Sequence, residues 1–433
     1  MLRGSSSTPR TSTPRRLSAS NGSQWSAASL VTVTALTTVL IASFIALTLK
    51  LQQPGCDRTP YNTSQLGKVI KLADGSRVYE VVVVTDLDHD SKDATKKNDW
   101  HSYMKRGVIT INRQITKATA VWHDENESIS YDAIVGKDIL GTRFALSQSV
   151  SSTCNRISSA RLQCMLSQTV RNSRSKNWLG IILHSSLAAG GRSMELSDLA
   201  VFDGNLLSID DRTGIVYKIV EDKALPWVLL VDGAGNETKG FKGEWLTVKD
   251  GELWAGGLGK EWTTTEGVFV SFNPMWVKRI TNDGCVRHVN WVQEYKRLRE
   301  AVGIHYPGYM IHESAQWSSF HRKWFFMPRR ASNQKYTEAE DENRGTNYLL
   351  IASEDFSHVE ARQVGNQNGP RGFSAFQFVP ETNDRIIVAL KSEEKGGIPV
   401  ASYVTVFDAQ SGHILLDEQP LQGKYKYEGI AFV

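Results

Sequence analysis

The chain has 433 residues, of which 40% are hydrophobic and 22% are charged, so it can form one large globular domain or two to three smaller ones. Four arginines among the first twenty residues and an excess of six positive charges within 133–183 account for more than the formal charge of +4. The remainder is acidic, so the composition gives no argument for nucleic-acid binding, and we expect no nucleic-acid partner.

An uncharged stretch begins near residue 26 and ends at residue 49. At about 1.5 Å per residue it spans roughly 35 Å, enough to cross a bilayer core of about 30 Å. Because arginines flank its N-terminal side, we expect residues 1–25 in the cytosol, 26–49 as a transmembrane signal anchor and 50–75 as a luminal stem. A cleaved signal peptide is the alternative, but the stretch is long for one and lacks a clear small-x-small cleavage site.

This topology predicts a single-pass type II membrane protein of the endoplasmic reticulum or Golgi. Secretion of the luminal part after cleavage is a further possibility that the sequence leaves open. Three sequons, at Asn62, Asn126 and Asn236, agree with luminal glycosylation. Of the four cysteines, Cys154 and Cys164 could pair in an oxidising lumen, but free or variably paired thiols fit equally well.

Beyond residue 70 the chain consists of short β-type runs separated by turn residues, with one expected helix at 291–302. Five stretches align in one register, and the spacings between their first residues are 47, 69, 61 and 54. Their first residues all carry oxygen: Ser197, Glu244, Glu313, Ser374 and Glu428. The first four stretches contain a strand, a turn and a second strand, which is typical of propeller blades.

The fifth stretch ends at Val433 after a single strand, so its partner must come from elsewhere. The run 77–88, which follows the turn residues 73–76, can supply it and so close the ring without exposed sheet edges. The sequence therefore predicts an all-β fold: a five-bladed β-propeller at 76–433, closed by N- and C-terminal strands in one blade and preceded by a single transmembrane helix.

If the first residues of the five stretches line the central channel, their oxygens face one another. Three carboxylates held this close would resist ionisation unless a cation binds them. Calcium accepts six to eight oxygen ligands, and the absence of His and Cys from the set disfavours zinc. We therefore expect Ca²⁺ on Ser197, Glu244, Glu313, Ser374 and Glu428, with Asp198 as a further carboxylate.

Basic residues follow 15 to 17 positions after the first four of these: Arg212, Lys260, Arg329 (with Arg330) and Lys391. Convergent Arg and Lys side chains suit a phosphate chain, so we expect them to bind substrate. Acidic residues nearby, among them Asp86, Asp88 and Asp211, could orient or deprotonate an attacking water. Four tryptophans offer candidate faces for stacking a nucleotide base: Trp100, Trp245, Trp262 and Trp317.

Eight motifs occur in one order: TDLD at 85–88, MELSDL at 194–199, DDRTG at 210–214, GLGKEWTTT at 257–265, HESAQW at 312–317, PRRAS at 328–332, ALKSEE at 389–394 and KYEGI at 426–430. With these motifs the chain resembles the calcium-activated nucleotidase (apyrase) family, in particular its membrane-anchored members. The resemblance implies a propeller with calcium in its tunnel, which hydrolyses nucleoside di- and triphosphates, with UDP, GDP and ADP as candidate substrates.

The same resemblance carries the calcium-ligand role to the five first residues, with Asp198 adjacent. It places Asp86, Asp88, Asp211, Arg212 and Arg329 in motifs for nucleotide binding and catalysis, and leaves Lys260, Arg330 and Lys391 as substrate-binding candidates. In a secretory lumen such an enzyme would support glycosylation, because it removes the UDP or GDP that glycosyltransferases release. The sequence does not indicate an oligomeric state.

One segment, about 132–183, departs from the family pattern. It is Ser-rich and basic, and it could be a surface loop, an accessory binding insertion or translated sequence foreign to the mature message. Two other functions stay open: a calcium-propeller hydrolase of the lactonase or phosphotriesterase type, and a non-catalytic luminal binding module. The cationic surroundings of the Glu/Ser set favour a phosphate substrate, and the joint presence of acidic and basic motifs favours catalysis.

Overall fold

The computed structural model describes residues 61–123 and 180–433, together with Leu36 and Thr38. The predicted anchor at 26–49, the sequon at Asn126 and the pair Cys154–Cys164 therefore lie outside the described residues, apart from those two positions. Within the described ranges no helix is long and apolar enough to cross a membrane. Cys285 is disulfide-bonded.

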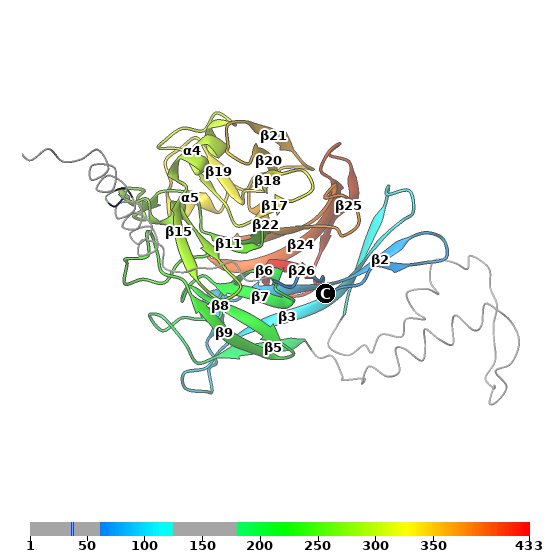
Figure 1. The fold of residues 1–433 in the computed structure, drawn as a ribbon, viewed down its shortest axis with the longest axis horizontal. Helices are drawn as coiled ribbons and strands as arrows, with labels where there is room; N and C mark the ends of the chain where they lie inside the picture. The colour runs from blue at the N-terminus through cyan, green and yellow to red at the C-terminus, as the bar shows by residue number, and fades with distance from the viewer. Residues whose placement is uncertain (1–35, 37, 39–60, 124–179) are drawn as a thin grey trace, which may run out of the picture. The chain divides into compact units, whose positions relative to one another are not determined.

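Four consecutive four-stranded antiparallel sheets form blades 1 to 4, which Figure 1 shows arranged around a common centre. Blade 1 contains β6 (Leu196–Phe202), β7 (Asn205–Asp210), β8 (Ile215–Val220) and β9 (Lys223–Leu229). Blade 2 contains β10 (Trp245–Lys249), β11 (Glu252–Gly256), β14 (Trp276–Ile280) and β15 (Val286–Asn290). Blade 3 contains β17 (Ala315–Ser318), β18 (Lys323–Phe326), β20 (Tyr348–Ser353) and β21 (Val359–Gln363). Blade 4 contains β22 (Arg371–Phe378), β23 (Ile386–Lys395), β24 (Ile398–Asp408) and β25 (Ile414–Pro420).

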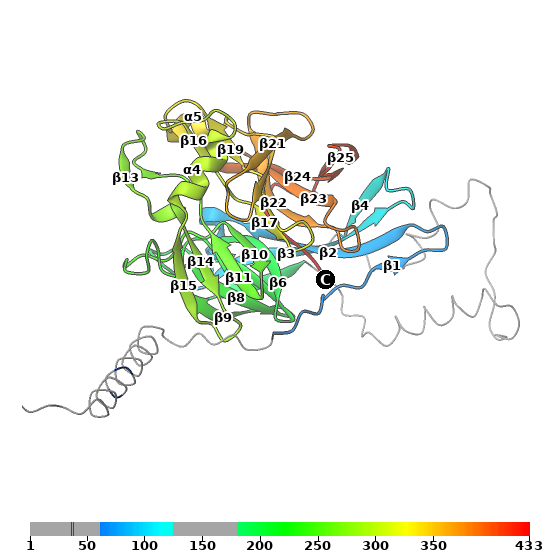
Figure 2. The same cartoon turned by 45° about the horizontal axis from the view of Figure 1, so that its top comes forward.

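Blade 5 closes the ring with strands from both ends of the propeller, as predicted. The C-terminal β26 (Lys426–Phe432) pairs with β2 (Arg77–Asp86), and Val83 lies opposite Ile430. The blade continues to β3 (Trp100–Ile111), whose two halves pair with β5 (Ile181–Ser185) and β4 (Ala118–Trp122). Figure 2 shows the blue β2 beside the C-terminus. The five-bladed, all-β prediction is therefore confirmed.

The remaining elements are short. They are β1 (Ile70–Lys71), which pairs with β2, the hairpin of β12 (Trp262–Thr263) and β13 (Phe269–Ser271), and the pair of β16 (Tyr309–Ile311) and β19 (Arg330–Ser332). Within residues 61–123 and 180–433 the helices are η1 (Asp88–Ser91), η2 (Asn273–Met275), α4 (Val292–Glu300) and α5 (Glu338–Asp341). The helix expected at 291–302 is thus α4.

Turn chemistry and burial explain the blades. The β6–β7 and β10–β11 turns are Asp203-Gly204 and Asp250-Gly251, and all four residues have positive φ, as a two-residue hairpin turn requires. Every residue of β26 is buried, whereas the outer strand β9 is mostly exposed or half-buried. The innermost strands contact one another in the cyclic order β26, β6, β10, β17, β22, which closes the channel.

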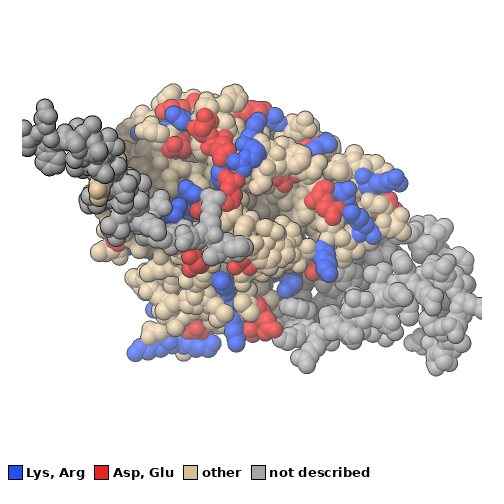
Figure 3. Space-filling model, viewed as in Figure 1, with Lys and Arg blue, Asp and Glu red and all other residues tan. Residues whose placement is uncertain are grey.

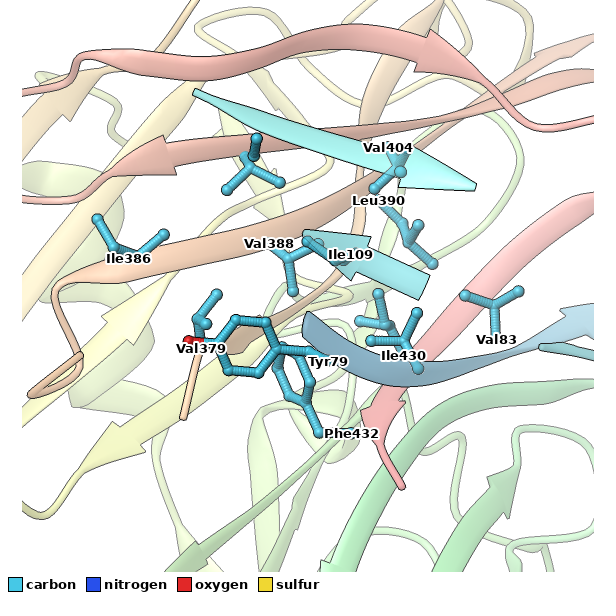
Figure 4. Packing of buried hydrophobic residues seen from close by; sticks show 14 of the residues in the cluster. Tyr79, Val83, Ile109, Val379, Ile386, Val388, Leu390, Val404, Ile430 and Phe432 are labelled. Carbon is cyan, nitrogen blue, oxygen red and sulfur yellow. The ribbon is translucent and has the colours of Figure 1, made fainter. Parts of the chain in front are cut away.

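A hydrophobic cluster fills each interface between neighbouring blades. Figure 4 shows the one between blades 4 and 5, where Tyr79 and Ile430 meet Val388 and Leu390. At the channel wall the blades approach so closely that only glycine fits at position 429. A Cβ there would lie 2.8 Å from the backbone carbon of Asp198 and 2.8 Å from Val84.

Residues near two of the predicted domain limits pack on the propeller. Part of the stem packs on the propeller. The rings of Tyr61 and Phe202 stack with their centroids 5.6 Å apart, and the Asn62 backbone N–H donates to Asp203 Oδ1 at 2.8 Å. The insertion predicted from the sequence ends at about residue 183, but residues 181–183 belong to β5. There Leu183 is fully buried, so this apolar end of the segment is part of blade 5.

Candidate functional site

The first residues of the five repeats meet at one end of the channel. Ser197, Ser374 and Glu428 lie within β6, β22 and β26, at the second, fourth and third residue of the strand, while Glu244 and Glu313 lie one and two residues before the inner strands β10 and β17. All five are at most 9% exposed. We call these five residues the ring.

The ring has the donor chemistry that a hard cation needs. The Ser197 Oγ is buried and makes no hydrogen bond, and the Glu244 Oε1 makes none either, although the Lys242 Nζ lies 3.0 Å away as an ion-pair partner. Burial raises the pKa of Glu244 to about 7, and Glu313 contributes to the increase. Burial likewise raises the pKa of Glu428. The ring therefore offers unsatisfied oxygens and resists ionisation, as expected of a calcium site.

Asp198 accepts backbone hydrogen bonds with both of its carboxylate oxygens, which gives the side chain a structural role. One of its carboxylate oxygens accepts the Leu199 amide at 2.8 Å, and the other accepts the Leu246 amide at 2.7 Å. The side chain thereby joins the inner strands β6 and β10. Since both oxygens already have backbone partners, we expect Asp198 to stabilise the fold, and its predicted role as a metal ligand stays a prediction.

Arg329 occupies the centre of the cluster and is fully buried. Its guanidinium donates to Glu313, to Glu428 at 2.7 Å and to Glu394. These carboxylates hold the pKa of Arg329 above its usual range despite its burial. The neighbouring Arg330 lies 4.0 Å from Glu394 and donates to a backbone carbonyl. The structure thus brings both predicted arginines next to the ring.

A second group of carboxylates stands beside the ring. Oxygens of Asp86, Asp88 and Glu195 all lie within 4.8 Å of one another, close enough to share a metal ion. Lys426 donates to Asp88 at 2.8 Å and lies 2.5 Å from Asp86, and Arg192 lies 3.0 Å from Asp88. The left-handed backbone of Asp88 (φ 48°) costs of order 1 kcal/mol, a strain that functional sites commonly hold.

The charges in this second group are unequal. Burial raises the pKa of Asp86 to about 8, although Lys426 opposes the increase. Burial would also raise the pKa of Asp88, but Lys426, Lys242 and Arg192 outweigh it and lower that pKa below its usual range. Two adjacent carboxyl groups with such different proton affinities are a common arrangement in acid–base catalysis.

Asp211 and Arg212 complete the cluster from the loop after β7. The Arg212 Nε donates to Glu195 at 2.7 Å and lies 3.8 Å from Asp211, which is also the partner of Lys242. Among the described residues, Asp86, Asp88, Asp211, Arg212, Arg329 and Arg330 therefore form one connected network with the ring.

Two predicted lysines differ from this pattern. Lys260 lies beside Tyr336, its Nζ 4.0 Å from the ring centroid, and burial lowers its pKa to about 8. It contributes with Arg330 to the electrostatics of Asp341, so it borders the cluster. Lys391 instead pairs with Glu418 at 2.6 Å in a groove between blades 3 and 4. The structure thus places Lys391 outside the network around the ring, and its predicted contact with substrate stays a prediction.

Four residues of the network were not among the predicted site residues: Arg192, Glu195, Lys242 and Lys426. Glu195 and Lys426 stand within MELSDL and KYEGI, so the motifs contained a signal for them, whereas Arg192 and Lys242 lie just outside. Three tryptophans proposed for base stacking are core residues, since Trp100, Trp245 and Trp317 are at most 5% exposed.

On the surface, Figure 3 shows positive and negative residues interspersed on one face.

Comparison with known proteins identifies relatives over most of the chain. A family model described as Apyrase matches residues 147–433. Apyrase apy-1 of Caenorhabditis elegans is 50% identical over 372 residues, which cover 86% of this chain and 89% of the worm protein. Soluble calcium-activated nucleotidase 1 of Rattus norvegicus is 44% identical over 355 residues, which cover 82% and 74%. An apyrase of Cimex lectularius is 46% identical over 250 residues, which cover 58% and 68%.

Proposed function

Because the chain belongs to the apyrase family, whose members hydrolyse nucleotides, we propose that it is a calcium-dependent enzyme that converts nucleoside di- and triphosphates into monophosphates and phosphate. UDP, GDP and ADP are its candidate substrates. The observation that carries this proposal is the junction of the ring with a buried network of arginines, lysines and carboxylates at one end of the channel.

The ring fits calcium by its chemistry. It offers hydroxyl and carboxylate oxygens, and the Ser197 Oγ has no other partner. Bound there, calcium would neutralise charge on a phosphate chain and polarise a phosphoryl oxygen. The name of the rat relative, a calcium-activated nucleotidase, agrees with this cofactor.

Cations beside the ring suit the phosphate chain. Arg329 and Arg212 present planar guanidinium groups that can bind phosphoryl oxygens bidentately, and Lys242, which contacts Asp211 and Glu244, adds a third positive charge. Phosphoanhydride cleavage depends mainly on positioning and charge neutralisation, which this arrangement supplies.

Asp86 is our candidate for the group that orients and deprotonates the attacking water. Its raised pKa, about 8, matches a general base that works near neutral pH. Its Oδ1 accepts the Asp88 amide at 2.8 Å, which fixes the carboxylate in place. Lys426 holds the other side of the same carboxyl group.

We further propose that the protein acts in the secretory pathway, as a type II membrane protein of the endoplasmic reticulum or Golgi. Its luminal propeller would remove the nucleoside diphosphates that glycosyltransferases release. The uncharged segment at 26–49 with its arginine-rich flank supports this topology. Exposure of Asn62 and Asn236 on the propeller unit is compatible with glycosylation at both sequons.

The test is phosphate release from UDP, GDP and ADP by the full-length protein, with calcium, with magnesium and with a chelator. We expect release that requires calcium and is lost in Glu244→Gln. The matched control is Glu360→Gln, because Glu360 lies on the outer strand β21. Folded wild-type protein that releases phosphate from none of the nucleotides would refute the proposal.

A further inference from the structure

Every carboxylate of the ring is ion-paired with a basic side chain. Arg329 contacts both Glu313 and Glu428, the latter at 2.7 Å. The Lys242 Nζ lies 3.0 Å from Glu244. The Lys426 Nζ lies 3.6 Å from Glu428. Each ring carboxylate therefore already has a cationic partner from the chain itself.

The same three cations also reach a second set of carboxylates outside the ring. Arg329 contacts Glu394, and Lys242 contacts Asp211. Lys426 lies 2.5 Å from Asp86 and 2.8 Å from Asp88. Each cation thus bridges the ring and the outer carboxylates, and we call Arg329, Lys242 and Lys426 the bridging cations.

We propose that the bridging cations couple the two ligands of this site: the phosphate chain of a nucleoside diphosphate draws them off the ring, and the freed carboxylates then bind calcium more tightly. This inference rests on the proposed function and adds to it a coupling between calcium binding and nucleotide binding. A cation on a carboxylate competes with calcium for the same oxygens. A diphosphate competes with that carboxylate for the cation, so the two ligands favour each other's binding.

Lys242 separates this mechanism from simple attraction between calcium and phosphate. Direct attraction would persist without Lys242, since it needs no mediator. The bridging mechanism predicts instead that loss of Lys242 has opposite effects on the two ligands. Calcium should bind Glu244 more tightly without its competitor, whereas the nucleotide should bind more weakly.

The experiment is calorimetric titration of calcium into the full-length protein, with and without a saturating non-hydrolysable methylene analogue of UDP. In the wild type we expect the analogue to tighten calcium binding about 5- to 100-fold, a usual range for coupled ligands. In Lys242→Met we expect tighter calcium binding without the analogue and a smaller tightening with it. Lys249→Met is the control, because Lys249 pairs with Asp250 and Glu354 at the far end of the inner strand and should change neither value.

Weaker calcium binding by Lys242→Met without the analogue, or an unchanged tightening with it, would overturn the coupling. Circular dichroism checks the fold of each variant, and Lys426→Met repeats the test with the same expectations if Lys242→Met does not fold. Phosphate release is measured with the same wild-type preparation, so that failure of the coupling can be told apart from failure of the proposed function. Hydrolysis without coupling refutes this inference alone, whereas loss of both nucleotide binding and hydrolysis refutes the proposed function.

Discussion

The ion pair between Arg299 and Glu261 ties helix α4 to the loop that carries Lys260. Arg299 donates from Nη1 and Nη2 to the two carboxylate oxygens at 2.7 and 2.8 Å, and the side chains are 2% and 5% exposed. Arg299→Met would leave the Glu261 charge buried without this partner. Breaking such a pair from one side costs about 3–5 kcal/mol, so we expect the free energy of unfolding to fall by that amount.

The double variant Glu261→Met, Arg299→Met removes both charges and should regain most of the loss, because two apolar side chains of similar size tolerate burial. Urea unfolding followed by tryptophan fluorescence is the assay, since α4 packs against Trp245 and Trp324. A loss below about 1 kcal/mol in Arg299→Met, the size of an exposed pair, would refute this reasoning. A double variant as unstable as the single one would do the same.

Three further predictions concern single side chains. Asp198→Asn should cost about 1–3 kcal/mol of stability, because one backbone amide loses its acceptor, while the calcium dissociation constant stays unchanged in calorimetry. Lys391→Met should release phosphate from UDP at the wild-type rate, and a loss of activity in folded protein would place Lys391 in the site after all. Burial lowers the pKa of His312 to about 3, so below pH 6.5 the unfolded chain takes up a proton that the folded chain refuses. Stability should therefore fall as pH decreases from 6.5 towards 3, by up to about 1.4 kcal/mol per pH unit, and His312→Phe should flatten that slope in urea titrations.

The propeller could be predicted from the sequence because the strand and turn pattern repeats once in every blade. Ser197, Glu244, Glu313, Ser374 and Glu428 each lie in an inner strand or within two residues before one, so one register located five strands at once. The closing blade followed from a single unpaired strand at the C-terminus. The exact ends of elements, such as β5 within the supposed insertion, depend on packing that no local pattern shows.

The site was less predictable because the direction of each side chain depends on how the strands are packed in the folded chain. Lys391 follows its repeat start by 17 residues and Arg329 follows its own by 16, yet the β-strand that contains Lys391 turns its side chain into the groove beside Glu418. Asp198 has the chemistry of a ligand, but two backbone amides occupy its oxygens. Lys242 lies outside the long motifs, and only the folded chain brings it between Asp211 and Glu244.

Two groups of oxygens could in principle hold the metal, and locating the ion distinguishes them. The measurement is a crystal structure of the protein with calcium or strontium, in which anomalous scattering identifies the ion. We predict a peak within the ring of Ser197, Glu244, Glu313, Ser374 and Glu428. An ion bound only between Asp86, Asp88 and Glu195, or no ion at saturating calcium, would contradict the account.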